Sequence, residues 1–549
     1  MMVISHVAKS LILKSSSGSR LGHMGLLLSG VLMGLWPVWP LAWVALVPLW
    51  FVTYRGGSLR YGALCGLIWG LGYQGMLLTW VLHLHPLMWL GVPWLGSIAI
   101  ATAAYVFVTL WGACIPMTWV LLMAIFKRRM PLARFGRFGR FGHIFIGTTL
   151  WCTLEVLAGL SPIYGTSLAI TQSPGNLVVL HLARLSGYLT ITAAIVAVNG
   201  LAAAGLFSWF QARSYDEDSI SFGPQRWLAA ALALLCVVHL IGWSLYQQPL
   251  ADKDAEAIRI GIIQGNIPTR EKLTQAGIRQ ARDRYLSSYK QLADAGADAV
   301  LTPEGAIPEI WRHRLRDNNL FYRAVQTIKI PLWLGTFVLA PTEEFHMYQS
   351  LIALLPESLK TTPQQSETHP ITNQYNKIKL VPLGEYIPLQ SVLGGIIRRL
   401  SPLDTTMIPG AAQQPRFDSG VGPAAVGICY DSAYGWIVRR QVAQGGQFIL
   451  TASNNDPYPP RMMGQHHGHD VIQAIATDRW AARATNTGLS ATVDPHGRTQ
   501  WMSEPKTYDA QVKTIYRRET TTAYVRWGNW LLPLLIVISI GWLVNSTKP

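Results

Sequence analysis

The stretch Ala424-Ala-Val-Gly-Ile-Cys-Tyr-Asp431 is a short apolar run that ends at a cysteine, followed by a tyrosine and an acid. A continuous apolar run of this length is typical of a buried strand, and Cys429 then lies where the strand gives way to a turn. In open α/β sheets, functional side chains gather at the carboxyl ends of strands. The stretch therefore predicts an α/β domain with Cys429 as a candidate functional residue.

Similar apolar runs alternate with helical patterns between about residues 250 and 520. The predicted strands cover residues 258–263, 299–301, 332–338, 424–428 and 448–450, and a helix is predicted over residues 275–295. Such alternation is typical of an α/β fold.

The rest of the chain has the composition of a membrane protein. Of the 549 residues of the whole chain, 50% are hydrophobic and 13% are charged, whereas soluble proteins carry about 25% charged residues. This composition excludes a disordered chain and a disulfide scaffold. A helix needs about 20 apolar residues to cross a bilayer. We predict eight spans, over residues 22–37, 38–54, 61–82, 94–126 (overlong), 143–160, 178–210, 226–246 and 527–545.

The predicted organisation follows from these spans. A cytoplasmic segment (1–21) precedes a membrane domain of about seven helices (22–246), an extracytoplasmic α/β domain (250–520) and a C-terminal membrane helix (527–545). The first two spans are short and share a break at Pro37–Pro40, so a single hairpin is an alternative for them.

The net charge of +16 belongs mainly to the apolar part of the chain. Residues 247–526 hold 30 Lys and Arg against 25 Asp and Glu, whereas the remainder holds 15 against 4. This distribution indicates membrane orientation rather than nucleic-acid binding. The basic residues lie in or beside alternate loops: Lys9, Lys14, Arg20, Arg55, Arg60, Lys127, Arg128, Arg129, Arg134, Arg137, Arg140, Arg213, Arg226 and Lys548. Arg184 is the one exception to this pattern. Because such loops stay cytoplasmic, both termini are predicted inside and the α/β domain outside.

Cys429 is the one cysteine of the α/β domain, since Cys65, Cys114, Cys152 and Cys236 fall inside predicted spans. A lone thiol in an oxidising compartment is either an inert core residue or a reactive one. A reactive thiol needs a base or a cation beside it.

Two other strand ends offer such partners. Glu304 follows the run that ends at Leu301, and Lys377 lies in a separate loop, where Lys379 is an alternative.

The order Glu304, Lys377, Cys429, each in its own flanking pattern, resembles the nitrilase superfamily. The stretch Tyr375-Asn-Lys-Ile-Lys-Leu-Val-Pro-Leu-Gly-Glu-Tyr-Ile-Pro-Leu389 resembles its membrane-bound apolipoprotein N-acyltransferases in particular. Further matches are Gln264-Gly-Asn-Ile267, Arg483-Ala-Thr-Asn-Thr-Gly-Leu-Ser490 and Asp494-Pro-His-Gly-Arg498. The resemblance extends over nearly the whole chain and implies a nitrilase-like α-β-β-α sandwich beside the membrane helices.

The resemblance also implies roles for individual residues. Glu304 is implied as the general base, Lys377 as the cation that stabilises the oxyanion, and Cys429 as the nucleophile. Glu385 matches a glutamate that supports the lysine. Tyr430 is interpreted as lining the acyl pocket. No metal or other cofactor is expected.

The implied reaction moves the sn-1 acyl chain of a phospholipid, through a thioester on Cys429, to the α-amino group of a lipoprotein's diacylglyceryl-cysteine. Both substrates lie in the bilayer, and the expected location is the bacterial inner membrane, with the catalytic domain on the periplasmic side. A membrane-tethered amidase or another acyl-transfer enzyme with the same three residues is the alternative. A transporter or receptor leaves Glu304, Lys377 and Cys429 unexplained.

Three departures from the family pattern are interpreted as touching substrate fit more than the catalytic residues. Thr302 stands where a tryptophan is usual, Asp431 replaces a glutamate, and Asn454-Asn-Asp-Pro-Tyr458 replaces an Asn-Asp-Ala-Trp-Phe-Gly type of run. Asp431 keeps the carboxylate but shortens its reach by one methylene.

Two further sets of polar residues have competing interpretations. Glu155 lies within a predicted span, where an ionisable group indicates either function or a structural hydrogen bond to another helix. His466, His467 and His469 invite a metal site, but their spacing fits no closed zinc site. A loop or a helix start near the active-site mouth is the expectation for them.

Overall fold

The structure is a computed structural model. It describes residues 20–129, 139–161, 163, 166–212, 223–312, 319–341, 346–356, 373–382, 384–386, 407–456 and 458–547. The chain forms two compact units: a helical unit (Met1–Leu82, Ala99–Gln248, Asn529–Pro549) and a sheet unit (His83–Ile98, Pro249–Gly528). Several basic residues used to predict orientation lie outside the described residues: Lys9, Lys14, Arg134, Arg137, Arg213 and Lys548.

The longer helices before and after the sheet unit are α2 (Arg20–Gly34), α3 (Val47–Arg55), α4 (Leu59–Leu77), α5 (Trp94–Arg129), α6 (Gly139–Leu160), α9 (Tyr188–Ala212), α10 (Pro224–Tyr246) and α18 (Leu531–Thr547). Within the described residues, four are long and apolar enough to cross a membrane: α5, α6, α9 up to Phe210, and α10. The chain is therefore a membrane protein with several candidate spans.

Several of the predicted spans are shorter or broken in the structure. Residues 38–54 form a 3₁₀ helix (Trp39–Trp43) and the nine-residue α3, with Pro48 in the first turn of α3. The predicted span 178–210 begins with two four-residue helices, α7 (Leu177–Leu180) and α8 (Ala183–Ser186), and α9 starts only after Gly187. By length and composition, four of the eight predicted spans are supported in the described residues, and the other four are not shown.

The sheet unit contains two sheets with helices on both outer faces. In the first, the strand order is β13 (Asp509–Tyr516), β1 (Ala257–Gln264), β2 (Ala299–Leu301), β4 (Leu332–Leu339), β5 (Met347–Leu354) and β6 (Gln374–Asn376), and β3 (Ile310–Trp311) pairs with β4. In the second, the order is β12 (Thr499–Met502), β11 (Ala491–Val493), β10 (Ala481–Thr485), β9 (Phe448–Ser453), β8 (Pro423–Ile428) and β7 (Phe417–Asp418).

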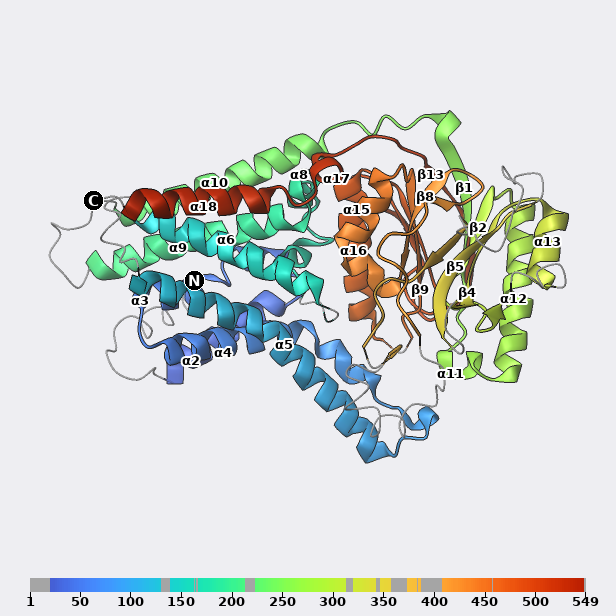
Figure 1. The fold of residues 1–549 in the computed structure, drawn as a ribbon, viewed down its shortest axis with the longest axis horizontal. Helices are drawn as coiled ribbons and strands as arrows, with labels where there is room; N and C mark the ends of the chain where they lie inside the picture. The colour runs from blue at the N-terminus through green and yellow to red at the C-terminus, as the bar shows by residue number, and fades with distance from the viewer. Residues whose placement is uncertain are drawn as a thin grey trace. The chain divides into compact units, whose positions relative to one another are not determined.

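The helices of the sheet unit are α11 (Thr269–Lys272), α12 (Gln275–Asp294), α13 (Leu320–Ile328), α15 (Gly435–Ala443), α16 (Pro460–Thr477) and α17 (Ala523–Trp527). Figure 1 shows α12 and α13 on the outer side of one sheet, and α15 and α16 on the outer side of the other. This is the layer order that the resemblance implied.

The central strands of both sheets are parallel. β1 pairs in parallel with β2, and β2 with β4, while β8 pairs in parallel with β9, and β9 with β10. Because the carboxyl ends of parallel strands meet at one edge of a sheet, the loops after β2 and β8 lie where functional side chains can converge.

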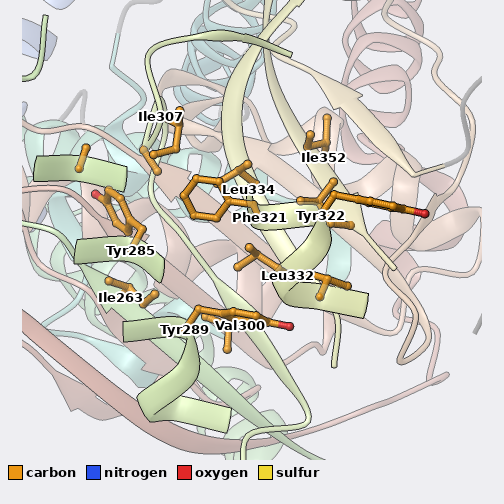
Figure 2. Packing of buried hydrophobic residues seen from close by; sticks show 14 of the residues in the cluster. Ile263, Tyr285, Tyr289, Val300, Ile307, Phe321, Tyr322, Leu332, Leu334 and Ile352 are labelled. Carbon is orange, nitrogen blue, oxygen red and sulfur yellow. The ribbon is translucent and has the colours of Figure 1, made fainter. Parts of the chain in front are cut away.

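Helix α12 holds the outer face of the first sheet through one apolar stripe. Ala281, Tyr285, Tyr289 and Leu292 recur at helical spacing and are buried. They pack with strand residues that include Val300, as Figure 2 shows. Burying each large side chain contributes about 1.5–3 kcal/mol. The opposite face of α12 is polar, so the helix covers the sheet with one side only.

Gly335 in β4 provides a test of how closely the loop before Glu304 packs. A Cβ atom at Gly335 would lie 2.0 Å from the carbonyl oxygen of Pro303. We expect Gly335→Ala to lower the free energy of unfolding by about 1–3 kcal/mol, because either the strand or the loop must shift. Gly427→Ala is the control, since the added Cβ would lie 3.8 Å from its nearest neighbour, an ordinary contact. Equal melting temperatures for the two variants would contradict this packing.

Candidate active site

Three loops of the sheet unit bring the predicted catalytic residues into one buried site. Glu304 follows β2, Lys377 follows β6 directly, and Cys429 follows β8 directly. Cys429 opens a 3₁₀ helix (Cys429–Ala433) and has φ +49°, a left-handed conformation that non-glycine residues rarely adopt. Such strain is kept only where the surrounding contacts fix it, and it is common at active sites.

Lys377 lies at the centre of the site. Its side chain is 0% exposed, and its Nζ lies 2.8 Å from Oε1 of Glu304 and 2.5 Å from Oε1 of Glu385. Its backbone N–H donates to the carbonyl of Gln349 (2.8 Å), which fixes the lysine to β5. Burial lowers the pKa of Lys377, but the carboxylates of Glu304 and Glu385 outweigh this and hold the pKa well above its usual value. The side chain is therefore a permanent ammonium.

The carboxylates of Glu304 and Glu385 are each held at both oxygens. Oε2 of Glu304 accepts from the backbone N–H of Asn454 (2.9 Å), and Oε2 of Glu385 accepts from that of Val381 (2.9 Å). Burial raises the pKa of Glu385, and the Lys377 charge opposes this effect. Glu304 is therefore oriented by one ammonium and one backbone amide.

The thiol of Cys429 belongs to the same cluster. Its Sγ lies 4.0 Å from the carbonyl oxygen of Asn454, the residue whose N–H binds Glu304. Burial raises the pKa of the Cys429 thiol, the negative charge of Glu304 raises it further, and Lys377 opposes both. The resting residue is thus a neutral thiol, which needs a base to become a nucleophile.

Asp431 ties the turn of Cys429 to the segment of Lys377. It is fully buried, and its carboxylate accepts from the backbone N–H groups of Lys379 (2.7 Å) and Ile428 (3.2 Å) and from the hydroxyl of Tyr375 (2.9 Å). Burial raises its pKa to about 6. The carboxylate therefore faces the protein backbone, not open space.

The structure distinguishes the two lysines that the sequence left open. The ammonium of Lys379 lies 4.4 Å from the centre of the Tyr434 ring, whereas Lys377 holds both glutamates. The ring of Tyr430 packs edge-on against that of Tyr434, with 5.3 Å between the ring centres. The place of Tyr430 in an acyl pocket stays a prediction.

Thr302 and Asp431 have structural surroundings, and the effect of the three departures on substrate fit stays a prediction. Thr302 is 0% exposed, and its hydroxyl donates to Trp333 O and accepts from Gly335 N. Asp431 is bound by the backbone, as described above. The backbone N–H of Asn454 binds Glu304, a contact that does not depend on the side chain at this position.

The histidines lie within α16, not in a loop or at a helix start as predicted, because α16 begins at Pro460. Nε2 of His466 lies 2.8 Å from the carbonyl oxygen of Cys429, and its Nδ1 lies 2.9 Å from the side-chain amide nitrogen of Asn455. The amide therefore donates to Nδ1, and the Nε2–H group donates to Cys429. Burial lowers the pKa of His466 and keeps the ring neutral. Sequence reasoning missed this link between His466 and Cys429.

Two other predicted polar sites have structural surroundings. Glu155 in the helical unit accepts hydrogen bonds from Ser167 (2.7 Å), Leu168 N (2.9 Å), Thr192 (2.9 Å) and Trp151 (3.1 Å), which match the structural interpretation. Among the described residues, no group of three or more His, Cys, Asp or Glu side chains could hold a metal ion.

A buried Glu-Lys-Cys cluster at the strand ends of a two-sheet sandwich defines a protein of the nitrilase superfamily. Accordingly, residues 259–520 match the family described as carbon-nitrogen hydrolase, and residues 25–201 match the apolipoprotein N-acyltransferase N-terminal domain. Relatives that match along most of their length place the chain more narrowly. The chain belongs to the apolipoprotein N-acyltransferase family, and it is an acyltransferase with a nitrilase-like catalytic domain.

Three of these relatives are cyanobacterial proteins called apolipoprotein N-acyltransferase. The one from a Nostoc species is 42% identical over 94% of this chain and 97% of its own length. The one from a Synechocystis species is 39% identical over 92% and 97%, and that of Thermosynechococcus vestitus is 42% identical over 92% of each. A solved amidase from Nesterenkonia sp. is 15% identical over 52% of this chain and 98% of its own, with a TM-score of 0.36.

The charge cluster predicts how Cys429 reacts with a small alkylating reagent. Because Glu304 raises the pKa of the thiol more than Glu385 does, Glu304→Gln should speed alkylation by iodoacetamide about tenfold near neutral pH, and Glu385→Gln less. Mass spectrometry of the peptide that contains Cys429 measures the rate. Glu309→Gln, which removes a half-exposed carboxylate paired with Arg282, should leave the rate unchanged. Slower alkylation in Glu304→Gln would contradict this prediction and would show that Glu304 acts on the thiol as a proton acceptor more than through its charge.

Proposed function

We propose that the protein transfers the sn-1 acyl chain of a membrane phospholipid, through a thioester on Cys429, to the α-amino group of a lipoprotein's diacylglyceryl-cysteine. The observation that carries this proposal is the buried cluster in which Lys377 holds Glu304 and Glu385 beside a neutral thiol. Membership of the acyltransferase family supports the choice of reaction.

The first step is acylation of Cys429. Glu304 takes the thiol proton as the sulfur attacks the ester carbonyl of the phospholipid. The carbonyl oxygen becomes negative, and Lys377 together with the backbone N–H of Tyr430 stabilises it. Each such donor contributes about 3 kcal/mol to the transition state. Glu304 then returns the proton to the departing glycerol oxygen, which leaves a thioester and a lysophospholipid.

The second step transfers the acyl group to an amine. Glu304 is again a carboxylate. It removes a proton from the α-amino group of the lipoprotein as the nitrogen of that group attacks the thioester. The C–S bond breaks, an amide forms, and the Cys429 thiolate regains a proton. Glu385 supports Lys377 through both steps, and Asp431 holds the turn that presents Cys429.

Both substrates of this reaction are lipids, which accounts for the membrane helices. Moving an acyl chain from the bilayer into water costs about 0.8 kcal/mol of free energy for each CH₂ group. The acyl group must therefore stay close to the bilayer. We assign residues 22–246 and 527–545 to the membrane, with eight crossings that include the shorter helices, and residues 250–520 to the catalytic domain. The loops rich in Lys and Arg favour cytoplasmic termini and a periplasmic catalytic domain in the bacterial inner membrane.

The test is incubation of the purified full-length protein with a phospholipid labelled in its sn-1 chain, followed by intact-mass measurement. We expect an adduct of one acyl group that hydroxylamine removes and that Cys429→Ala lacks, while the buried, membrane-embedded Cys152→Ala keeps it. The adduct should then pass to a diacylated lipopeptide with a free amine. Absence of the adduct would contradict the proposal, and discharge to water instead of the amine would indicate a hydrolase.

A further inference from the structure

The acid–base balance around Cys429 includes a second buried cation, Lys272. This residue ends the short helix α11 and is 4% exposed. Among the described residues its ammonium makes no ion pair within 4 Å, although burying an unpaired charge is costly. A buried charge without a close partner is unusual unless it acts on a neighbouring group.

The position of Lys272 is fixed by contacts with the catalytic loops. The backbone N–H of Thr269 donates to Asp456 (3.0 Å), and the side-chain amide of Asn454 donates to the Thr269 hydroxyl (3.1 Å). Asn454 is the residue whose backbone N–H binds Glu304. Helix α11 is therefore held by the same loop that orients the base.

The ammonium of Lys272 reaches the residue that follows the base. A Cβ atom at Gly305 would lie 3.8 Å from Nζ of Lys272 and 3.4 Å from Nε2 of Gln349. That amide nitrogen is buried and has no hydrogen-bond partner among the described residues. Gly305 has φ +53°, a conformation that favours glycine, so no side chain stands between the loop and the two donors, the ammonium of Lys272 and the amide of Gln349. Both donors favour negative charge at this point.

Burial lowers the pKa of Lys272 to about 8. The carboxylates of Glu304, after β2, and Asp456, after β9, oppose this effect and raise the pKa. The carboxyl groups of Glu304 and Glu385 both bind the ammonium of Lys377. An oxyanion that forms in this site adds a negative charge where acids already exceed cations. A second cation offsets that excess.

We propose that Lys272 is a positioning residue for catalysis, a second buried cation beside the loop of Glu304 that offsets the negative charge that develops during acylation. This inference rests on the proposed function of Cys429. It assigns Lys272 no contact with the substrate, so its influence is electrostatic and acts across the loop of Glu304.

The experiment measures single-turnover acylation of Cys429 by labelled phospholipid between pH 5.5 and 9.5 in the full-length protein. Lys272→Met should slow acylation about tenfold below about pH 8, where Lys272 of the parent protein carries its charge, and the difference should shrink as the pH rises above 8. Lys272→Arg should keep the rate of the parent protein below pH 8, and Lys290→Met, an exposed lysine on α12, should change nothing.

A role in packing alone would lower the rate of Lys272→Met by the same factor at every pH, and that result would overturn the proposal. If Lys272→Met does not fold, the arginine variant still decides. The parent protein should lose rate as the pH rises through about 8, where Lys272 gives up its proton, and Lys272→Arg should not. Equal alkaline limbs would overturn the proposal. If the parent protein itself forms no acyl adduct, the proposed function fails instead, so the two failures are distinguishable.

Discussion

Lys377 is fully buried, and its ammonium is held between the carboxylates of Glu304 and Glu385. Removing an ion from water costs several kcal/mol, so this charge is tolerable only where its partners are already in place. The partners come from separate loops, and each glutamate is also bound by a backbone amide. The charge on Lys377 thus requires the strand ends to meet, and the same requirement sets Glu304 beside the thiol of Cys429.

Much of the fold was predictable because burial leaves a strong pattern. The predicted strands at 258–263 and 448–450 lie within β1 and β9, and the helix predicted over 275–295 is α12. β12 is largely exposed and β13 is mostly half-buried, and both were missed because neither carries a continuous apolar run. Four of the eight predicted membrane spans are long and apolar enough in the described residues, and the other four stay a prediction. Hydropathy does not show where a run is broken, as at Gly187 before α9.

The catalytic site was predictable where chemistry coincides with a strand end. Glu304 and Cys429 follow buried strands directly or nearly so, and the family resemblance selected Lys377, which only the structure separates from Lys379 by its contacts. Lys272 and His466 could not be found in this way. A lysine in a polar four-residue helix has the pattern of an exposed charge, and burial of a histidine in α16 depends on distant segments.

The coupling of Lys377 with Glu304 is the central claim, and a double-mutant cycle on the rate of Cys429 acylation tests it most directly. Lys377→Met and Glu304→Gln should each slow acylation by about 100-fold or more. If the two groups act as one unit, the double variant should be no slower than the slower single variant. Losses that multiply in the double variant would show that the two side chains act independently, which would contradict the account.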